Sequence, residues 1–230
     1  MIVAPSVDAF DLQGHRGARG LAPENTLAAF AMALEIGVTT LETDLAVTSD
    51  GVLVLSHDPV LNPHIVRGAD GSWLSVPGPA INALTLAQLK RFDVGRIDPS
   101  SRYARQFPGQ KPADGERIPA LAELFELVRR AGKGVRFNIE TKVSPDKPAQ
   151  SPDPDTFARL VVEAIRAAGP RATARASGAP GPCCNLAQVR ASRRALRLCH
   201  QHSNPSVTLG LVAHGRGMPF SAITSRARSG

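Results

Sequence analysis

Residues 14–26 read GHRGARGLAPENT and place a histidine and an arginine side by side between glycines. Residues 10–13, just before them, have the apolar alternation of a short strand. The Pro-Glu-Asn-Thr segment that follows is typical of the start of a helix. His15 and Arg16 therefore follow directly on a strand, and Gly14 and Gly17 allow the backbone to turn there. The stretch predicts a strand-to-helix turn that carries two basic side chains.

Beyond this turn the sequence alternates between helical and extended patterns. Apolar residues at helical spacing predict helices over residues 23–38, 84–95, 118–132 and 155–169. Extended patterns predict strands over residues 40–47, 52–56 and 135–142. Strands that alternate with helices predict an α/β fold with a largely parallel sheet and crossover helices.

Charge divides the chain near residue 169. Residues 1–169 hold 18 Lys and Arg against all 20 Asp and Glu, whereas residues 170–230 hold nine Arg and no acid. The sequence pI near 10.0 thus reflects the second part, and we expect no nucleic-acid partner from it. No apolar run is long enough for a transmembrane helix. Residues 1–10 lack the features of a signal peptide, so we expect a cytoplasmic protein, or an exported one if a signal-bearing start precedes this sequence.

The strand over residues 40–47 contains the sequence LETDL. Side chains at positions i and i+2 of a strand point to the same face, so Glu42 and Asp44 project together. Two carboxylates on a buried face are costly unless their charge is neutralised. A hard divalent cation would do this, because Ca²⁺ and Mg²⁺ prefer carboxylate oxygens. A solvated edge strand or a salt-bridged pair would explain the same pattern.

The strand over residues 135–142 repeats this arrangement in FNIETK. Glu140 and Lys142 share a face, which offers a third carboxylate and a positive charge for an anion. His57 follows the apolar strand over residues 52–56. Parallel barrels build their sites where strands end, so we expect these side chains to meet. Two histidines can act as acid and base near neutral pH, and the cations suit a phosphoryl group.

Together these motifs resemble the glycerophosphodiester phosphodiesterase family. The similarity lies in HRG-x5-PENT at residues 15–26, Glu-x-Asp at 42–44, His-Asp at 57–58 and Glu-x-Lys at 140–142, and it covers roughly residues 10–169. It implies a TIM (β/α)8-barrel phosphodiesterase that cleaves glycerophosphodiesters to glycerol 3-phosphate and an alcohol. Such a barrel usually needs about 250 residues. We therefore expect only the first four βα units, within a domain over residues 10–169.

The resemblance also implies roles for individual residues. The implied site comprises catalytic His15 and His57, phosphate-binding Arg16 and Lys142, and metal-binding Glu42, Asp44 and Glu140. A Ca²⁺ or Mg²⁺ ion would orient the glycerol 2-hydroxyl beside phosphorus, and a cyclic phosphate would form and then be opened by water. The sequence does not decide which histidine is the acid. We interpret Asn25, Asp58 and His64 as structural, and Glu24 as an acid in the first helical turn.

Residues 170–230 lack the family's later motifs. We expect an Arg-rich tail that is disordered or translated out of frame. This leaves two alternatives to a glycerophosphodiesterase that acts on a small-molecule substrate. One is a truncated, inactive remnant that binds a partner or, weakly, a membrane surface through its basic tail. The other is a related TIM-barrel phosphodiesterase that acts on lysophospholipids.

Overall fold

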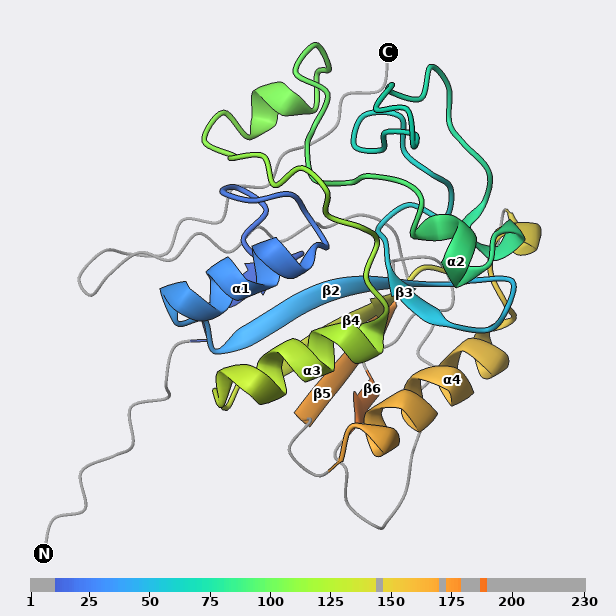
Figure 1. Cartoon of the computed structure of the whole chain (residues 1–230). Coiled ribbons are helices and arrows are strands. Elements are labelled where there is room, and N and C mark those ends of the chain that lie inside the picture. Colours follow the sequence, from blue (N-terminus) through green and yellow to red (C-terminus); the bar gives the residue numbers. More distant parts are fainter. Residues whose placement is uncertain (1–10, 144–146, 170–172, 179–186, 190–230) are drawn as a thin grey trace, which may run out of the picture.

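One mixed β-sheet organises the chain. The computed structural model describes residues 11–143, 147–169, 173–178 and 187–189. Its strands are β1 (Gln13–His15), β2 (Thr40–Val47), β3 (Leu53–Leu55), β4 (Arg136–Thr141), β5 (Thr173–Gly178) and β6 (Ala187–Val189). The sheet order is β1-β2-β4-β5-β6, and β3 pairs with β2 off this path (Figure 1). Because β1, β2, β4 and β5 are parallel neighbours, the expected α/β fold with a largely parallel sheet is confirmed.

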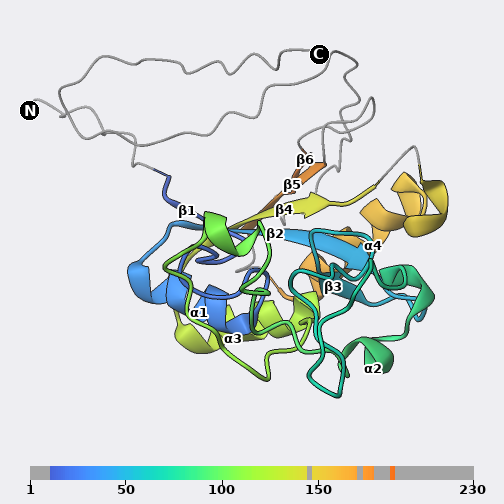
Figure 2. The same ribbon diagram turned by 90° about the horizontal axis from the view of Figure 1, so that it is seen from above.

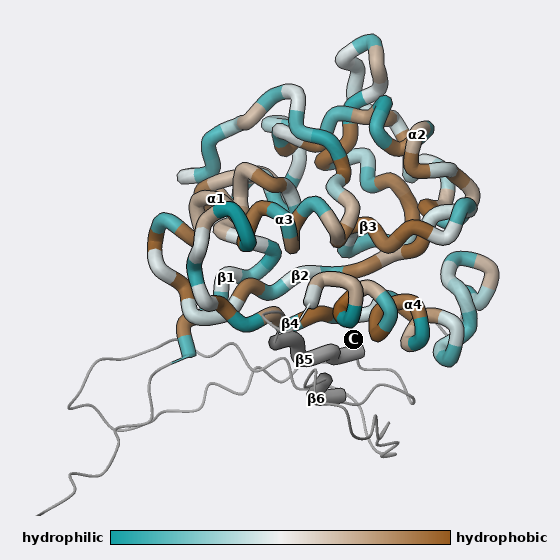
Figure 3. Tube along the Cα trace, turned by 60° about the horizontal axis from the view of Figure 1, so that its bottom comes forward, coloured by the Kyte–Doolittle hydropathy of each residue, from teal (hydrophilic) through white to brown (hydrophobic). Residues whose placement is uncertain are grey.

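Three helices pack on one face of the sheet. They are α1 (Leu27–Ile36), α3 (Leu121–Ala131) and α4 (Pro154–Ala167). Their apolar side chains form one core with Leu41 and Leu45 of β2 and with Phe137 and Ile139 of β4. Figure 2 shows α1 and α3 side by side beneath the sheet, and Figure 3 shows hydrophobic residues running through β3 and recurring along α4. Since strand side chains alternate, positions 42, 44 and 140 face away from this core.

A second apolar cluster lies under the long loops. It includes Val54, Leu61, Ile81 and Leu89, which join β3 to residues 59–94. The long loops hold the short helix α2 (Leu86–Leu89) and two 3-10 turns, η1 (Ile81–Ala83) and η2 (Ala104–Gln106). A third 3-10 turn, η3 (Pro148–Gln150), precedes α4. The predicted helix over residues 84–95 is thus a single turn. In the part of the chain that the structure describes, no helix is long and apolar enough to cross a membrane.

The first strand and helix differ in their bounds from the sequence prediction. β1 includes His15, so this residue belongs to the strand and does not follow it. The helix predicted from residue 23 begins at Leu27, because the Thr26 side chain accepts the Ala29 backbone N–H as an N-cap. Gly37 ends the helix in the left-handed region with φ 88°. The Pro-Glu-Asn-Thr segment is therefore a loop.

β3 runs antiparallel to β2, contrary to the expectation that it adds to the parallel sheet. Leu45 pairs with Leu55, and Val47 pairs with Leu53, across a turn at residues 48–52. A parallel crossover needs about a dozen residues or more, so this connection is too short for one. The hairpin brings the chain back along β2 towards Asp44.

The parallel sheet continues beyond residue 169. β5 pairs with β4 from Arg136↔Thr173 to Thr141↔Gly178, and β6 pairs with β5 in the antiparallel sense. Because β3 is antiparallel, the fourth parallel strand is β5, which lies in the segment expected to be a tail. Among the described residues the sheet is open, with β1 and β6 at its ends. We expected residues 170–230 to be disordered or translated out of frame. Most of these residues lie outside the described ones.

Candidate functional site

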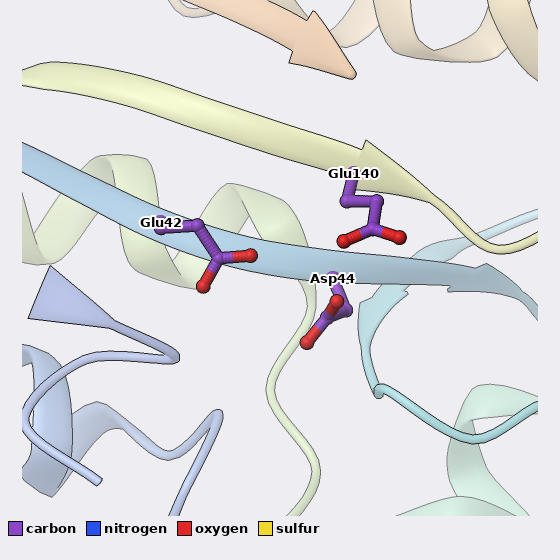
Figure 4. A group of neighbouring side chains, drawn as sticks. All are labelled: Glu42, Asp44 and Glu140. Atoms are coloured by element: carbon purple, nitrogen blue, oxygen red, sulfur yellow. The ribbon is translucent and has the colours of Figure 1, made fainter. Parts of the chain in front are cut away.

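Three carboxylates meet on the face of the sheet opposite the helices. Glu42 and Asp44 project from β2 and Glu140 from β4, where Asp44 and Glu140 are register partners (Figure 4). One oxygen of each lies within 4.8 Å of the others. Glu42 and Asp44 are buried and Glu140 is half-buried. The prediction from the i, i+2 spacing, that these carboxylates share a face and come together, is confirmed.

Two cations balance much of this negative charge. Nζ of Lys142 lies 2.9 Å from Asp44 Oδ1 and 2.8 Å from Glu140 Oε1, and Nε of Arg16 lies 3.1 Å from Asp44 Oδ2. Burial by itself would raise the pKa of Asp44, but Lys142 and then Arg16 outweigh it, so that pKa is lowered. Burial likewise opposes the charge of Lys142, but Asp44 raises its pKa. The site is thus a network of paired charges.

Arg16 is fixed by its backbone as well as its side chain. Its φ of 53° lies in the left-handed region, which is uncommon for a residue other than glycine. In this conformation its backbone N–H donates to Glu42 Oε2 at 2.7 Å, and its Nη1 donates to Glu24 Oε1 at 2.9 Å. The structure therefore places Arg16 against the carboxylates, buried and held by two acids besides Glu42.

Asn25, which we interpreted from the sequence as a structural residue, contacts the site directly. Its Nδ2 donates to Asp44 Oδ2 at 3.1 Å, and its Oδ1 accepts from the Thr43 hydroxyl at 3.0 Å. Its φ is 53°, so the loop turns sharply at this residue. The Pro-Glu-Asn-Thr motif pointed to this segment. Spacing along the chain, however, does not show that the loop folds back over β2.

Glu24 belongs to the same network and not to the first turn of a helix, so that expectation is wrong. It is buried, it pairs with Arg16, and it accepts a hydrogen bond from the Tyr103 hydroxyl. Tyr103 lies 79 residues further along the chain. No sequence pattern predicts this contact, because it joins two loops.

The two histidines flank the carboxylates from different elements. Nε2 of His15 lies 3.7 Å from Glu42 Oε2, and burial, then Arg19 and Arg16, lower the His15 pKa to about 4. His57 reaches the site through the β2–β3 hairpin, since the Ser56 backbone N–H donates to the Asp44 carbonyl at 3.0 Å. Both histidines expected in the site are therefore near it.

Asp58 and Asn62 orient His57. Nδ1 of His57 lies 3.0 Å from Asp58 Oδ1, and Asn62 Nδ2 donates to Asp58 Oδ2 at 2.7 Å. The expected structural role of Asp58 is thus supported by a specific contact. His64 lies in the loop after this group, where its carbonyl accepts the Asp98 backbone N–H.

The donor set fits a hard divalent cation. Its oxygens are carboxylate oxygens, the ligands that Ca²⁺ and Mg²⁺ prefer. Burial, and then the neighbouring Asp44, raise the pKa of Glu42 to about 8. In the metal-free protein this carboxyl therefore holds a proton at neutral pH that a divalent cation would displace.

Comparison with protein-family models agrees with the family resemblance of the sequence. A model of the glycerophosphoryl diester phosphodiesterase family matches residues 15–208 of the chain. A glycerophosphodiester phosphodiesterase from Caldanaerobacter subterraneus subsp. tengcongensis is 35% identical over 128 residues, which cover 56% of this chain and 43% of that protein.

Two solved structures extend the comparison to the fold. A protein from Silicibacter pomeroyi assigned as a glycerophosphoryl diester phosphodiesterase is 33% identical with a TM-score of 0.67, covering 75% of this chain and 59% of that one. An Oleispira antarctica phosphodiesterase, solved in complex with the product sn-glycerol-3-phosphate, is 27% identical with a TM-score of 0.52, covering 74% and 57%. The chain therefore spans about half the length of these relatives.

Proposed function

Because the chain belongs to the glycerophosphoryl diester phosphodiesterase family, we propose that it hydrolyses glycerophosphodiesters to glycerol 3-phosphate and an alcohol. The solved relative with sn-glycerol-3-phosphate bound supports a small-molecule substrate of this kind. The observation that carries the proposal is the convergence of Glu42, Asp44 and Glu140 to within 4.8 Å, with two histidines and two cations beside them.

We assign the binding of a divalent cation to these three carboxylates. When bound, Ca²⁺ or Mg²⁺ would supply Lewis-acid polarisation of the phosphoryl oxygens. Lys142 and Arg16 already carry positive charge at the carboxylates, and they would stabilise the negative charge that grows on the phosphoryl oxygens in the transition state. Loss of either cation would also leave Asp44 underpaired.

His15 and His57 carry the proton transfers in this proposal. One accepts the proton of the glycerol 2-hydroxyl as its oxygen forms a bond to phosphorus, and the other donates a proton to the alcohol oxygen as its bond to phosphorus breaks. A cyclic phosphate results. Water then opens it, with the two roles reversed, and glycerol 3-phosphate is released. The Asp58 contact fixes the orientation of the His57 ring for either role.

We further propose that the described sheet is part of a (β/α)8 barrel. The four parallel strands, the helices on one face and the polar site on the other support this arrangement. The free edge of β1 is where a further parallel strand would pair to close it.

The first experiment measures release of choline from glycerophosphocholine and from lysophosphatidylcholine, with Ca²⁺, with Mg²⁺ and with a chelator. We expect metal-dependent release from the glycerophosphodiester that is lost in His15→Ala, a variant that also controls for contaminating enzyme. Release of product from the lysophospholipid alone would favour the related lipid phosphodiesterase. No release from either substrate by a folded, metal-binding protein would favour the non-catalytic remnant.

A further inference from the structure

Residues 95–113 form a loop that packs against the chain just after the His15–Arg16 turn. We call this loop the strap. Gln110 Nε2 donates to the Arg19 carbonyl at 2.7 Å, and the Lys111 backbone N–H donates to the Leu21 carbonyl at 2.9 Å. Tyr103 of the strap donates to Glu24. In Figure 1 the strap lies above the loop that follows β1. It therefore packs against the loop that carries Arg16 and Glu24 of the candidate site.

The strap lines an open cavity of about 300 Å³. This is the lower end of the range for small-molecule pockets. Its lining residues include Arg96, Arg105, Phe107 and Gln110. Arg96 is paired with Asp114, whereas no carboxylate among the described residues pairs with Arg105. The cavity therefore offers apolar surface and positive charge together.

Arg19 links this cavity to the candidate site. Its guanidinium carbon lies 5.1 Å from the centre of the Phe107 ring, so one face of that ring already holds a cation. Arg19 follows Arg16 of the candidate site by three residues, and Glu24 joins Arg16 to Tyr103 of the strap. No carboxylate among the described residues neutralises Arg19. A substrate group that extends from the carboxylate cluster towards the strap thus meets an unpaired cation.

We propose that the strap cavity binds the alcohol portion of the diester, and that Arg19 selects a neutral polyol or an anionic alcohol over a quaternary ammonium alcohol. This inference rests on the proposed phosphodiesterase function. Guanidinium N–H groups donate to the hydroxyls or anionic oxygens of such an alcohol. A quaternary ammonium group is repelled by Arg19, and Arg19 covers the aromatic face that would otherwise attract it.

The test compares kcat/KM for glycerophosphoglycerol and glycerophosphocholine in the metal-loaded full chain. We expect the wild-type protein to prefer glycerophosphoglycerol, and Arg19→Gln to lower the preference about tenfold, partly through a gain on glycerophosphocholine. The double change Arg19→Gln with Phe107→Leu should remove that gain. Arg159→Gln on α4, whose side chain is exposed and pairs with Glu163, is the matched control and should leave the ratio unchanged.

Three outcomes decide the inference. Hydrolysis of both diesters with the same ratio in wild type and Arg19→Gln would overturn it while leaving the proposed function intact. If neither diester is hydrolysed, calorimetric Kd values for the two diesters replace kcat/KM, and a ratio that shifts only in Arg19→Gln supports the cavity without catalysis. Failure to bind either diester would overturn both proposals.

Discussion

Asn25 Nδ2 donates a hydrogen bond to Asp44 Oδ2 at 3.1 Å. A loop residue with φ 53° thus fixes a carboxylate of the central strand, although the two residues lie 19 positions apart. Groups that orient a metal ligand from behind typically change metal affinity 10–100-fold when they are removed. Asn25 is therefore a positioning residue for the metal site proposed above.

Replacing Asn25 tests this role. We expect Asn25→Ala to weaken Ca²⁺ or Mg²⁺ binding by about tenfold or more, because Asp44 loses its amide partner. Asn25→Gly removes the amide but tolerates the left-handed backbone, so it separates the lost contact from strain. Isothermal calorimetry with each metal makes the measurement. Asn82→Ala, which loses only a bond to the Ala149 carbonyl, is the control, and wild-type affinity in Asn25→Gly would disprove the role.

Tyr103→Phe probes the chain from the strap to Arg16. The substitution removes only the hydroxyl group. Glu24, which accepts a hydrogen bond from Arg16, then loses its second side-chain donor. We expect kcat for diester hydrolysis to fall several-fold, while the ring packing against Phe107 preserves most of the stability. Enzyme kinetics and thermal unfolding on the same preparation separate the two effects. A fall in Tm with unchanged kcat would show that the hydroxyl serves the fold alone.

Gly17 tolerates no side chain. Its φ is 78°, and an added Cβ would lie 2.7 Å from the carbonyl carbon of Ala29 in α1. We expect Gly17→Ala to destabilise the protein by about 2 kcal/mol or more, since it combines backbone strain with a clash against a helix. Urea unfolding measures this loss. Gly20→Ala, where an added Cβ meets nothing within 4 Å, should stay close to wild type, and equal losses in both variants would refute the argument.

Metal affinity should depend on pH through Glu42. The pKa of Glu42 is about 8 in the metal-free fold, because burial and then Asp44 disfavour its charge. Below that pH the metal displaces a proton, so affinity should rise by up to about tenfold per unit from pH 6 to 8 and then level off. Calorimetry at pH 6.5 in two buffers of different ionisation enthalpy should show about one proton released. Proton-independent binding would contradict the prediction.

The stability of the metal-free protein should change in the opposite sense over the same range. The folded state keeps the Glu42 proton up to about pH 8, whereas the unfolded chain releases it near the ordinary value of about 4.3. Through Glu42 the folded protein binds more protons between these values. Stability therefore falls as the pH rises above about 6.5, where His15, whose own pKa is lowered, no longer opposes the trend. Urea unfolding with chelator at several pH values checks this, and Glu42→Gln should flatten the dependence.

The alternation of side chains along a strand was enough to predict which face of the sheet carries the carboxylates. Alternation along β2 and β4 put Glu42, Asp44 and Glu140 on one face, because side chains two apart in a strand point the same way. The apolar spacing likewise predicted α3 over residues 118–132, close to its observed bounds of Leu121–Ala131. The family motifs added the identity of the chain, which the comparisons confirmed.

Contacts between segments that are distant in sequence depend on the folded chain as a whole. The antiparallel return of β3 brings His57 towards Asp44, and the loop at Asn25 folds over the same carboxylate. β5 joins the sheet from a segment whose composition resembles a tail. Sequence patterns report which face a residue prefers, whereas loop closure and strand pairing depend on the summed packing of the whole chain. The amino-acid sequence therefore determined the chemistry of the site, and the fold decided which groups hold that chemistry in place.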